Sequence, residues 1–315
     1  MTLDQANQKA QEAWILIAEG ELKAATDIGQ LLIDAGFEVG YRIHSAIAEA
    51  TEEWDLSETV IKEGIEAHPT AWPLHLQLGT LYTQTGRFEE AMEAFELALA
   101  QPEVETHWIH MNQAVVLSQI GQIDEALNLL QGIEHEEMRN QAFELKMQIL
   151  DQFQQHEVML EIVAEELEDL VPPTDEEEAA LMSRILALVA NACYYDDKPE
   201  KETRFYLRQA IEYDRSNEIA LMVLREMRAE FTENGKLYGF LIQANLKAEE
   251  GIVPVMTTYG ILADNQNEAM EMIMEFEVEA LDRDSIEVME IEETIPEEEE
   301  ELKGIYMVGG WGFLN

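Results

Sequence analysis

Residues 72–102 read WPLHLQLGTLYTQTGRFEEAMEAFELALAQP, and this stretch decides the fold. Large and small side chains alternate along two stripes at helical spacing. The small residues are Gly79, Ala91 and Ala98, and the large ones are Leu78, Tyr82 and Phe95. A turn at Thr85–Arg87, which contains a glycine, separates the stripes. The stretch therefore predicts two helices joined by a short turn.

The stretch sets a period of 34 residues, and the flanking chain keeps nearly the same period. On the N-terminal side, Ser57, Ile61 and Gly64 repeat the small, large, small order, and Pro69 closes the unit. On the C-terminal side, five residues lie 35 positions beyond Gly79, Tyr82, Gly86, Ala91 and Phe95: Ala114, Leu117, Gly121, Ala126 and Leu130. Three consecutive units in register predict a helical repeat architecture.

This pattern resembles the tetratricopeptide repeat, most clearly over residues 38–140 and in degenerate form to about residue 250. The resemblance implies that Gly79, Ala91 and Ala98 let two antiparallel helices approach closely while the large residues fill the space between them. The sequence departs from the family pattern at His75, which stands where the family usually has the first-helix Trp.

The resemblance gives a mainly α fold with three parts. Residues 1–172 are expected to form a solenoid, with residues 6–37 as a degenerate capping pair. Residues 141–172 are expected to form a splayed pair, with Leu160, Ala164 and Leu167 on its second helix. Residues 173–250 are expected to continue it, ending in a pair at Glu218–Thr232 and Lys236–Glu249. About six to seven helix pairs result.

Residues 251–315 have a different composition. VPVMTTYGILA is rich in β-branched and aromatic residues, NEAMEMIMEFEVEAL has helical spacing, and SIEVMEIEE and KGIYMVGGWGFL are extended runs around an acidic loop. We expect a small folded β-α-β-β module, because a disordered tail would be poor in large apolar residues. The closing GGWGFL is expected to be an edge segment or an anchor against the solenoid. The family of this module is not recognised.

Composition limits the partners. The chain has 66 acidic and 19 basic residues, a net charge of −47. Such a surface repels nucleic acid and anionic membranes, which are bound by Lys and Arg. The acidity fits solvation in a saline or acid-rich proteome, or alternatively a basic protein partner or nucleic-acid mimicry. The lone Cys193 and the absence of an apolar run of about 20 residues predict a cytoplasmic protein.

The sequence lacks the common motifs of enzyme active sites and cofactor sites. The sequence has no phosphate-binding loop, no GxSxG and no zinc pattern, so we expect no enzyme activity and no cofactor. His107 and His110 stand three apart, as two metal ligands could, but no third ligand is evident and helix packing is the preferred interpretation.

The resemblance implies a concave groove lined by fixed positions of each first helix. Transferred to this sequence, the expected partner-binding residues are Arg42, Leu76, Thr80, Trp108, Met111, Val115, Gln119, Leu145, Ile149 and Phe153. Family members that clamp a peptide carboxylate need Lys, Arg and Asn at such positions, and this set has only Arg42. An apolar lining instead suits an amphipathic helix or an apolar segment, unless these side chains simply pack between helices.

One stretch is locally basic. Residues 198–228 hold seven of the 19 basic residues, and Lys201, Arg204 and Arg208 share one helical face. Nearby acids favour a self-paired, solvated face, and the alternative is a docking site for an acidic partner or for the chain's own acidic loop.

The leading hypothesis is a scaffold or chaperone-like adaptor that holds a protein or peptide segment in an apolar groove. The alternative is an acidic inhibitor or mimic that binds a basic protein through its outer surface. An enzyme regulated by the repeat domain is a distant third.

Overall fold

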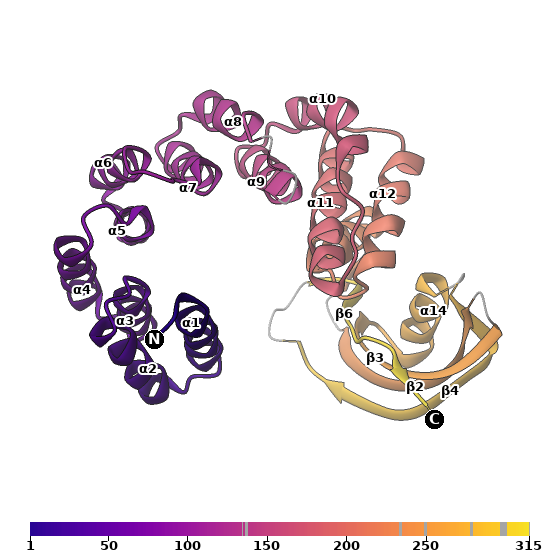
Figure 1. The fold of residues 1–315 in the computed structure, drawn as a ribbon. Coiled ribbons are helices and arrows are strands. Elements are labelled where there is room, and N and C mark those ends of the chain that lie inside the picture. Colours follow the sequence, from indigo (N-terminus) through magenta and orange to yellow (C-terminus); the bar gives the residue numbers. More distant parts are fainter. Residues whose placement is uncertain are drawn as a thin grey trace. The chain divides into compact units, whose positions relative to one another are not determined.

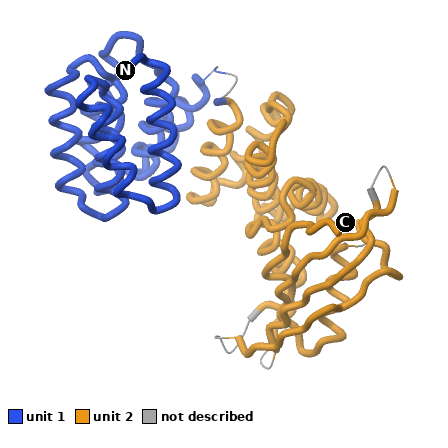
Figure 2. The backbone as a smooth tube through the Cα atoms, turned by 60° about the horizontal axis from the view of Figure 1, so that its bottom comes forward, with its two compact units in different colours: residues 1–138 blue, residues 139–315 orange. Residues whose placement is uncertain are grey.

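The computed structural model describes residues 1–133, 135, 138–232, 235–248, 251–277, 280–296 and 301–314. The chain forms two compact units, residues 1–138 and residues 139–315 (Figure 2).

Unit 1 consists of four antiparallel helix pairs, which follow one another along the chain (Figure 1). They are α1 (Leu3–Ala18) with α2 (Leu22–Asp34), α3 (Val39–Ala50) with α4 (Trp54–Ala67), α5 (Trp72–Gln84) with α6 (Phe88–Leu99), and α7 (Thr106–Gln119) with α8 (Ile123–Gln131). Gly86 and Gly121 turn the chain inside their pairs with φ of 74° and 79°. The α3–α4 turn has no glycine, and Glu52 adopts φ 59° there instead.

The α5–α6 pair shows why the small residues matter. A Cβ atom built on Gly79 would lie 2.3 Å from Cε1 of Phe95, so the Phe95 ring occupies the place of a side chain on α5. Ala91 and Ala98 are fully buried on the facing helix, and Phe95 has no exposed surface. The predicted register of this repeat is confirmed.

We expect Gly79→Ala to lower the free energy of unfolding by about 1–3 kcal/mol, because the new methyl group must displace a fully buried ring. Gly132→Ala is the matched control: its new Cβ would come no closer than 3.4 Å to a neighbour. That variant should stay within about 0.5 kcal/mol of the parent. Urea unfolding of both variants measures the difference, and equal stabilities would refute the close approach at Gly79.

An ionic cluster joins α4 to the α5–α6 turn. Glu58 accepts hydrogen bonds from Arg87 (2.6 Å), Lys62 (2.6 Å) and the Tyr82 hydroxyl (2.9 Å). The guanidinium of Arg87 also lies 4.0 Å from the centre of the Tyr82 ring. The hydrogen bond from Arg87, followed by those from Lys62 and Tyr82, lowers the pKa of Glu58 to about 2.

This shift sets a pH dependence. Because the pKa of Glu58 is lowered on folding from 4.5 to about 2, its contribution to stability is fully present above pH 4.5 and is lost as the pH falls towards 2. Glu58→Gln should therefore be less stable than the parent at pH 7, and the difference should shrink over that window. Glu63→Gln, an exposed change on the same helix, is the control in thermal melts at each pH. A difference that stays constant from pH 7 to pH 2 would contradict the role of Glu58.

Unit 2 begins with helices. They are α9 (Arg139–Gln152), α10 (His156–Glu166), the short 3-10 helix η2 (Leu167–Asp169), α11 (Glu176–Tyr195), α12 (Glu200–Tyr213) and α13 (Glu218–Arg228). The boundary predicted at 172/173 lies between η2 and α11. Leu160 and Ala164 lie on α10 as expected, but Leu167 lies in η2. The buried side chains of α10 are Met159 and Val163. Since α9 packs against α11 as well as α10, α10 contacts its neighbours through this stripe.

The second helix expected at Lys236–Glu249 is wrong. Residues Lys236–Ala248 form strand β2, and Glu249 lies outside the described residues. Tyr238, Phe240, Ile242 and Ala244 are buried at every second position, which is the period of a strand. Extending the repeat pattern to this segment hid the alternation.

The rest of unit 2 is an antiparallel sheet, which confirms a mainly α fold with an α+β module. The strands are β2, β3 (Gly251–Ala263), β4 (Leu281–Thr294), β6 (Gly304–Val308) and β7 (Gly312–Phe313), in the order β4-β2-β3-β6 with β7 also paired to β3. Two further strands, β1 (Phe231–Thr232) and β5 (Glu301–Leu302), pair with each other. Helix α14 (Gln266–Phe276) packs on the sheet, so the expected order β-α-β-β is present with β2 added before it (Figure 1).

A β-bulge explains the imperfect alternation in SIEVMEIEE. Leu241 pairs with Glu290 and Ile242 pairs with Val288, so Met289 is an extra residue in β4. The module has a core of its own, which includes Phe240, Tyr259, Ile273 and Leu281, and Leu221 of α13 joins it. A folded module with the α14 helix on a sheet follows.

Candidate partner-binding surfaces

The first helices of the pairs in unit 1 form one layer. Helix α1 packs against α3, and α5 packs against α7. The amide of Gln77 on α5 donates to the carbonyl oxygen of Arg42 (3.2 Å) and to Ser45 (3.0 Å) on α3. The hydroxyl of Thr80 donates to Asn112 on α7 (3.3 Å). We call the side of this layer that faces away from the second helices the first-helix surface.

The predicted residues of unit 1 are distributed over α3, α5 and α7. Half-buried residues are Arg42, Leu76, Thr80, Met111 and Val115, and exposed ones are Trp108 and Gln119. Trp108, Met111 and Val115 stand three and four residues apart, on one stripe of α7. The Thr80–Asn112 hydrogen bond places this stripe beside Leu76 and Thr80 of α5.

Trp108 is the most exposed large side chain of this set. It is 41% exposed, and its indole nitrogen donates to Glu105 at 3.2 Å. The ring lies 5.5 Å from that of His107. The indole is thus oriented by the N-cap residue of its own helix while part of its surface remains exposed.

Arg42 is engaged within unit 1. Its guanidinium lies 6.0 Å from the centre of the Trp14 ring on α1. Burial raises the pKa of the Glu38 carboxyl group, and the positive charge of Arg42 partly offsets this rise. Arg42 is therefore packed among residues of unit 1.

The predicted residues of unit 2 are a separate set on α9 and the turn after it. Leu145 is half-buried and Phe153 is 38% exposed. Ile149 is only 2% exposed, because α9 packs against both α10 and α11. Ile149 is therefore a core residue of unit 2.

The two histidines weighed as metal ligands lie in different surroundings. His107 stacks on His135 with 4.5 Å between ring centres, and His110 is half-buried on α7. Within the part of the chain that the structure describes, no three His, Cys, Asp or Glu side chains come together as metal ligands. The thiol of Cys193 is buried, which raises its pKa to about 12.

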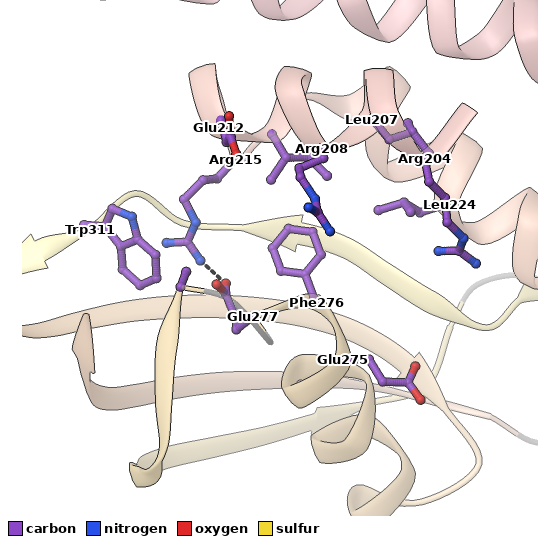
Figure 3. Close-up of a pocket in the computed structure, with 12 residues that line it drawn as sticks. Arg204, Leu207, Arg208, Glu212, Arg215, Leu224, Glu275, Phe276, Glu277 and Trp311 are labelled. Atoms are coloured by element: carbon purple, nitrogen blue, oxygen red, sulfur yellow. Dashed lines mark hydrogen bonds and ion pairs between the residues drawn. The ribbon is translucent and has the colours of Figure 1, made fainter. Parts of the chain in front are cut away.

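The sequence did not reveal a pocket of about 560 Å³ in unit 2, which we call the α12 pocket (Figure 3). Its lining residues come from α12, α13, the end of α14 and the C-terminal segment. They are Arg204, Leu207, Arg208, Ile211, Glu212, Arg215, Leu224, Glu275, Phe276, Glu277, Ala280 and Trp311. The only sequence signal for it was the basic stripe Lys201, Arg204 and Arg208.

One wall of the α12 pocket is a buried ionic cluster. Arg215 pairs with Glu277, which is 3% exposed, and donates to the hydroxyl of Tyr259 at 3.2 Å and to the carbonyl oxygen of Gly309 at 3.4 Å. The Arg215 guanidinium stacks on Trp311 at 3.2 Å from the ring centre. Burial, and then the neighbouring carboxylate, raise the pKa of Tyr259. The closing GGWGFL is thus both an edge segment, through β7, and an anchor against the helices, through Trp311.

Several basic residues of the stretch 198–228 are self-paired, as expected. Lys198 pairs with Asp196 (2.7 Å), Arg204 with Glu200 (2.6 Å), and Arg228 with Glu230 and Glu275 (3.1 Å each). Among the helices described, none is long and apolar enough to cross a membrane.

Comparison with known proteins identifies the repeat. Residues 73–101 match the family model of the tetratricopeptide repeat. No curated protein matches the chain. This repeat lies within a run of packed helix pairs, which defines a helical-repeat protein. The chain therefore contains a tetratricopeptide repeat at residues 73–101, which lies within this run of helix pairs.

Solved structures with similar helical arrays are distant in sequence. A structure of pilF from Pseudomonas aeruginosa is 12% identical, with 71% of this chain and 98% of that chain covered and a TM-score of 0.49. PilW, a type IV pilus biogenesis factor, is 17% identical, with 71% and 100% covered and a TM-score of 0.49. YrrB, a protein of the same repeat class with an unusual peptide-binding site, is 18% identical, with 62% and 96% covered and a TM-score of 0.41.

Proposed function

We propose that this protein is a non-enzymatic scaffold that holds an apolar segment of a partner protein on the first-helix surface of unit 1. The observation that carries the proposal is Trp108, a 41% exposed indole beside the half-buried Met111 and Val115. Tryptophan is enriched among residues that dominate binding energy, and methionine adapts to different apolar partners.

The same surface argues for an apolar segment over a peptide carboxylate. Its basic member, Arg42, is already packed near Trp14 and Glu38. The stripe of α7 offers an indole, a thioether and a branched aliphatic group at 3- and 4-residue spacing. An amphipathic helix or an apolar extended segment matches such a stripe.

Trp108→Ala should weaken partner binding by about 1–3 kcal/mol with a smaller loss of stability. Trp54→Ala is the matched control, because Trp54 is 39% exposed but lies on α4, a second helix. Binding of a captured partner to the purified variants is measured by isothermal titration at about 0.5 M salt, where attraction between surface charges is screened. Equal affinities for the parent and Trp108→Ala would remove the first-helix surface from consideration.

A second candidate is binding of a basic protein segment to the acidic outer surface, and strand β4 favours it. Among the described residues β4 pairs only with β2, so it forms an edge of the sheet. Glu287, Glu290 and Glu292 are exposed along it, and the apolar Val288 and Met289 are exposed among them. An open edge can accept an added strand, and these acids suit one with alternating basic and apolar residues.

For this candidate we expect Glu290→Lys/Glu292→Lys to abolish binding of a peptide with alternating Lys and Val at about 0.05 M salt. Glu161→Lys/Glu165→Lys makes the same charge change at exposed positions on α10 and should keep most of the binding. Fluorescence anisotropy of the labelled peptide measures both. An equal loss in the two variants would mean that net charge alone attracts the peptide and that β4 is not a site.

A further inference from the structure

Much of the α12 pocket is built from a stretch of the chain where the charge is locally balanced. Residues 198–228 contain seven basic and six acidic residues, although the whole chain has a net charge of −47. The basic residues Arg204 and Arg208 stand four apart on α12 and both line the pocket. Arg204 and Arg208 therefore bring positive charge to this pocket, which the carboxylates of Glu212 and Glu275 also line.

The pocket combines these cations with apolar walls. Leu207 and Ile211 come from α12, and Leu224 comes from α13. Phe276 is the last residue of α14. Figure 3 shows the side chains of Arg204 and Arg208 directed from α12 towards Leu224 and Phe276. A guanidinium beside apolar walls suits a ligand that has an apolar body and an anionic end.

Arg215 and Glu277 already satisfy each other, and Arg215 has further partners in Tyr259 and Gly309. They form one wall of the pocket, and the residues that remain to contact a ligand lie at its rim. At the rim, Arg204 pairs with Glu200 on its own helix, with side chains 59% and 67% exposed. Such exposed pairs contribute little to stability, so a ligand anion can replace Glu200 at little cost.

We propose that the α12 pocket binds an amphipathic carboxylate, an apolar group of aromatic or medium-chain acyl size that carries one anion next to Arg204. The volume of about 560 Å³ falls among those of small-molecule sites. The carboxylate can belong to a free acid or to the end of a peptide, because both present the same chemistry. The site is separate from the first-helix surface and does not depend on the function proposed for it.

The acidity of the whole chain does not prevent such binding. At physiological salt, charges more than about 8 Å away are largely screened, whereas a guanidinium in contact with a carboxylate is not. A ligand anion next to the apolar walls of the pocket is better shielded from water than the exposed carboxylate of Glu200, so its contact with Arg204 is stronger than the pair that it replaces.

The test uses the full chain and 8-anilinonaphthalene-1-sulfonate, an aromatic anion that fluoresces in apolar surroundings. We expect saturable binding that Arg204→Gln weakens about tenfold, the loss of one charged hydrogen bond. Lys201→Gln is the control, because Lys201 is exposed on the same helix but does not line the pocket. Phe276→Ala should also weaken binding, and far-ultraviolet circular dichroism verifies that each variant is folded.

Competition identifies the source of the anion. Displacement of the dye by decanoate assigns a free acid, and displacement only by a short acetylated peptide ending in Glu-Phe assigns a peptide end; either result supports the site. Decanamide has the same chain without the charge and should not compete. Equal dye affinity in the parent and Arg204→Gln, equal competition by decanamide and decanoate, or no displacement by either acid would overturn the proposal.

Discussion

The close approach of two helices within a pair is the constraint on which the repeat array depends. At Gly79 the facing Phe95 ring lies where a side chain would be, so a glycine on one helix and a large ring on the other are parts of one contact. Ala91 and Ala98 keep the second helix equally close. Because the second helices fill the space behind the first ones, the first helices pack on each other and present a continuous surface.

A different interaction holds the end of the array to the sheet. Arg215, in the turn between α12 and α13, enters the α+β module and meets Glu277, Tyr259, Gly309 and Trp311. A buried ion pair of this kind costs desolvation, and its hydrogen bonds must be nearly complete to compensate. Loss of one partner would leave the other charged and buried. The α12 pocket exists beside this cluster because α12 and the end of α14 are held there without filling the space between them.

The first-helix surface and the α12 pocket would bind their ligands through different interactions. The first-helix surface offers buried apolar area around an exposed indole, which salt does not weaken. The α12 pocket adds two guanidinium groups to apolar walls, so it depends on local charge. High net charge keeps the rest of the surface solvated and limits association with other anions at long range.

The sequence by itself determined the helix pairs between residues 38 and 131, because a repeated local pattern of large and small residues specifies each contact several times over. It also determined that residues 251–315 hold a strand-rich module, since Tyr259, Ile273 and Ile305 could not remain solvated. The repeat pattern gave a wrong prediction at Lys236–Ala248. The segment was expected to be the second helix of a repeat, but its buried residues alternate with period two and it forms strand β2. Only the tertiary structure decided that Ile149 is buried and that Arg204, Phe276 and Trp311 line one pocket. Those facts depend on contacts between residues far apart in the chain, and no spacing within a single segment encodes which distant segments will meet.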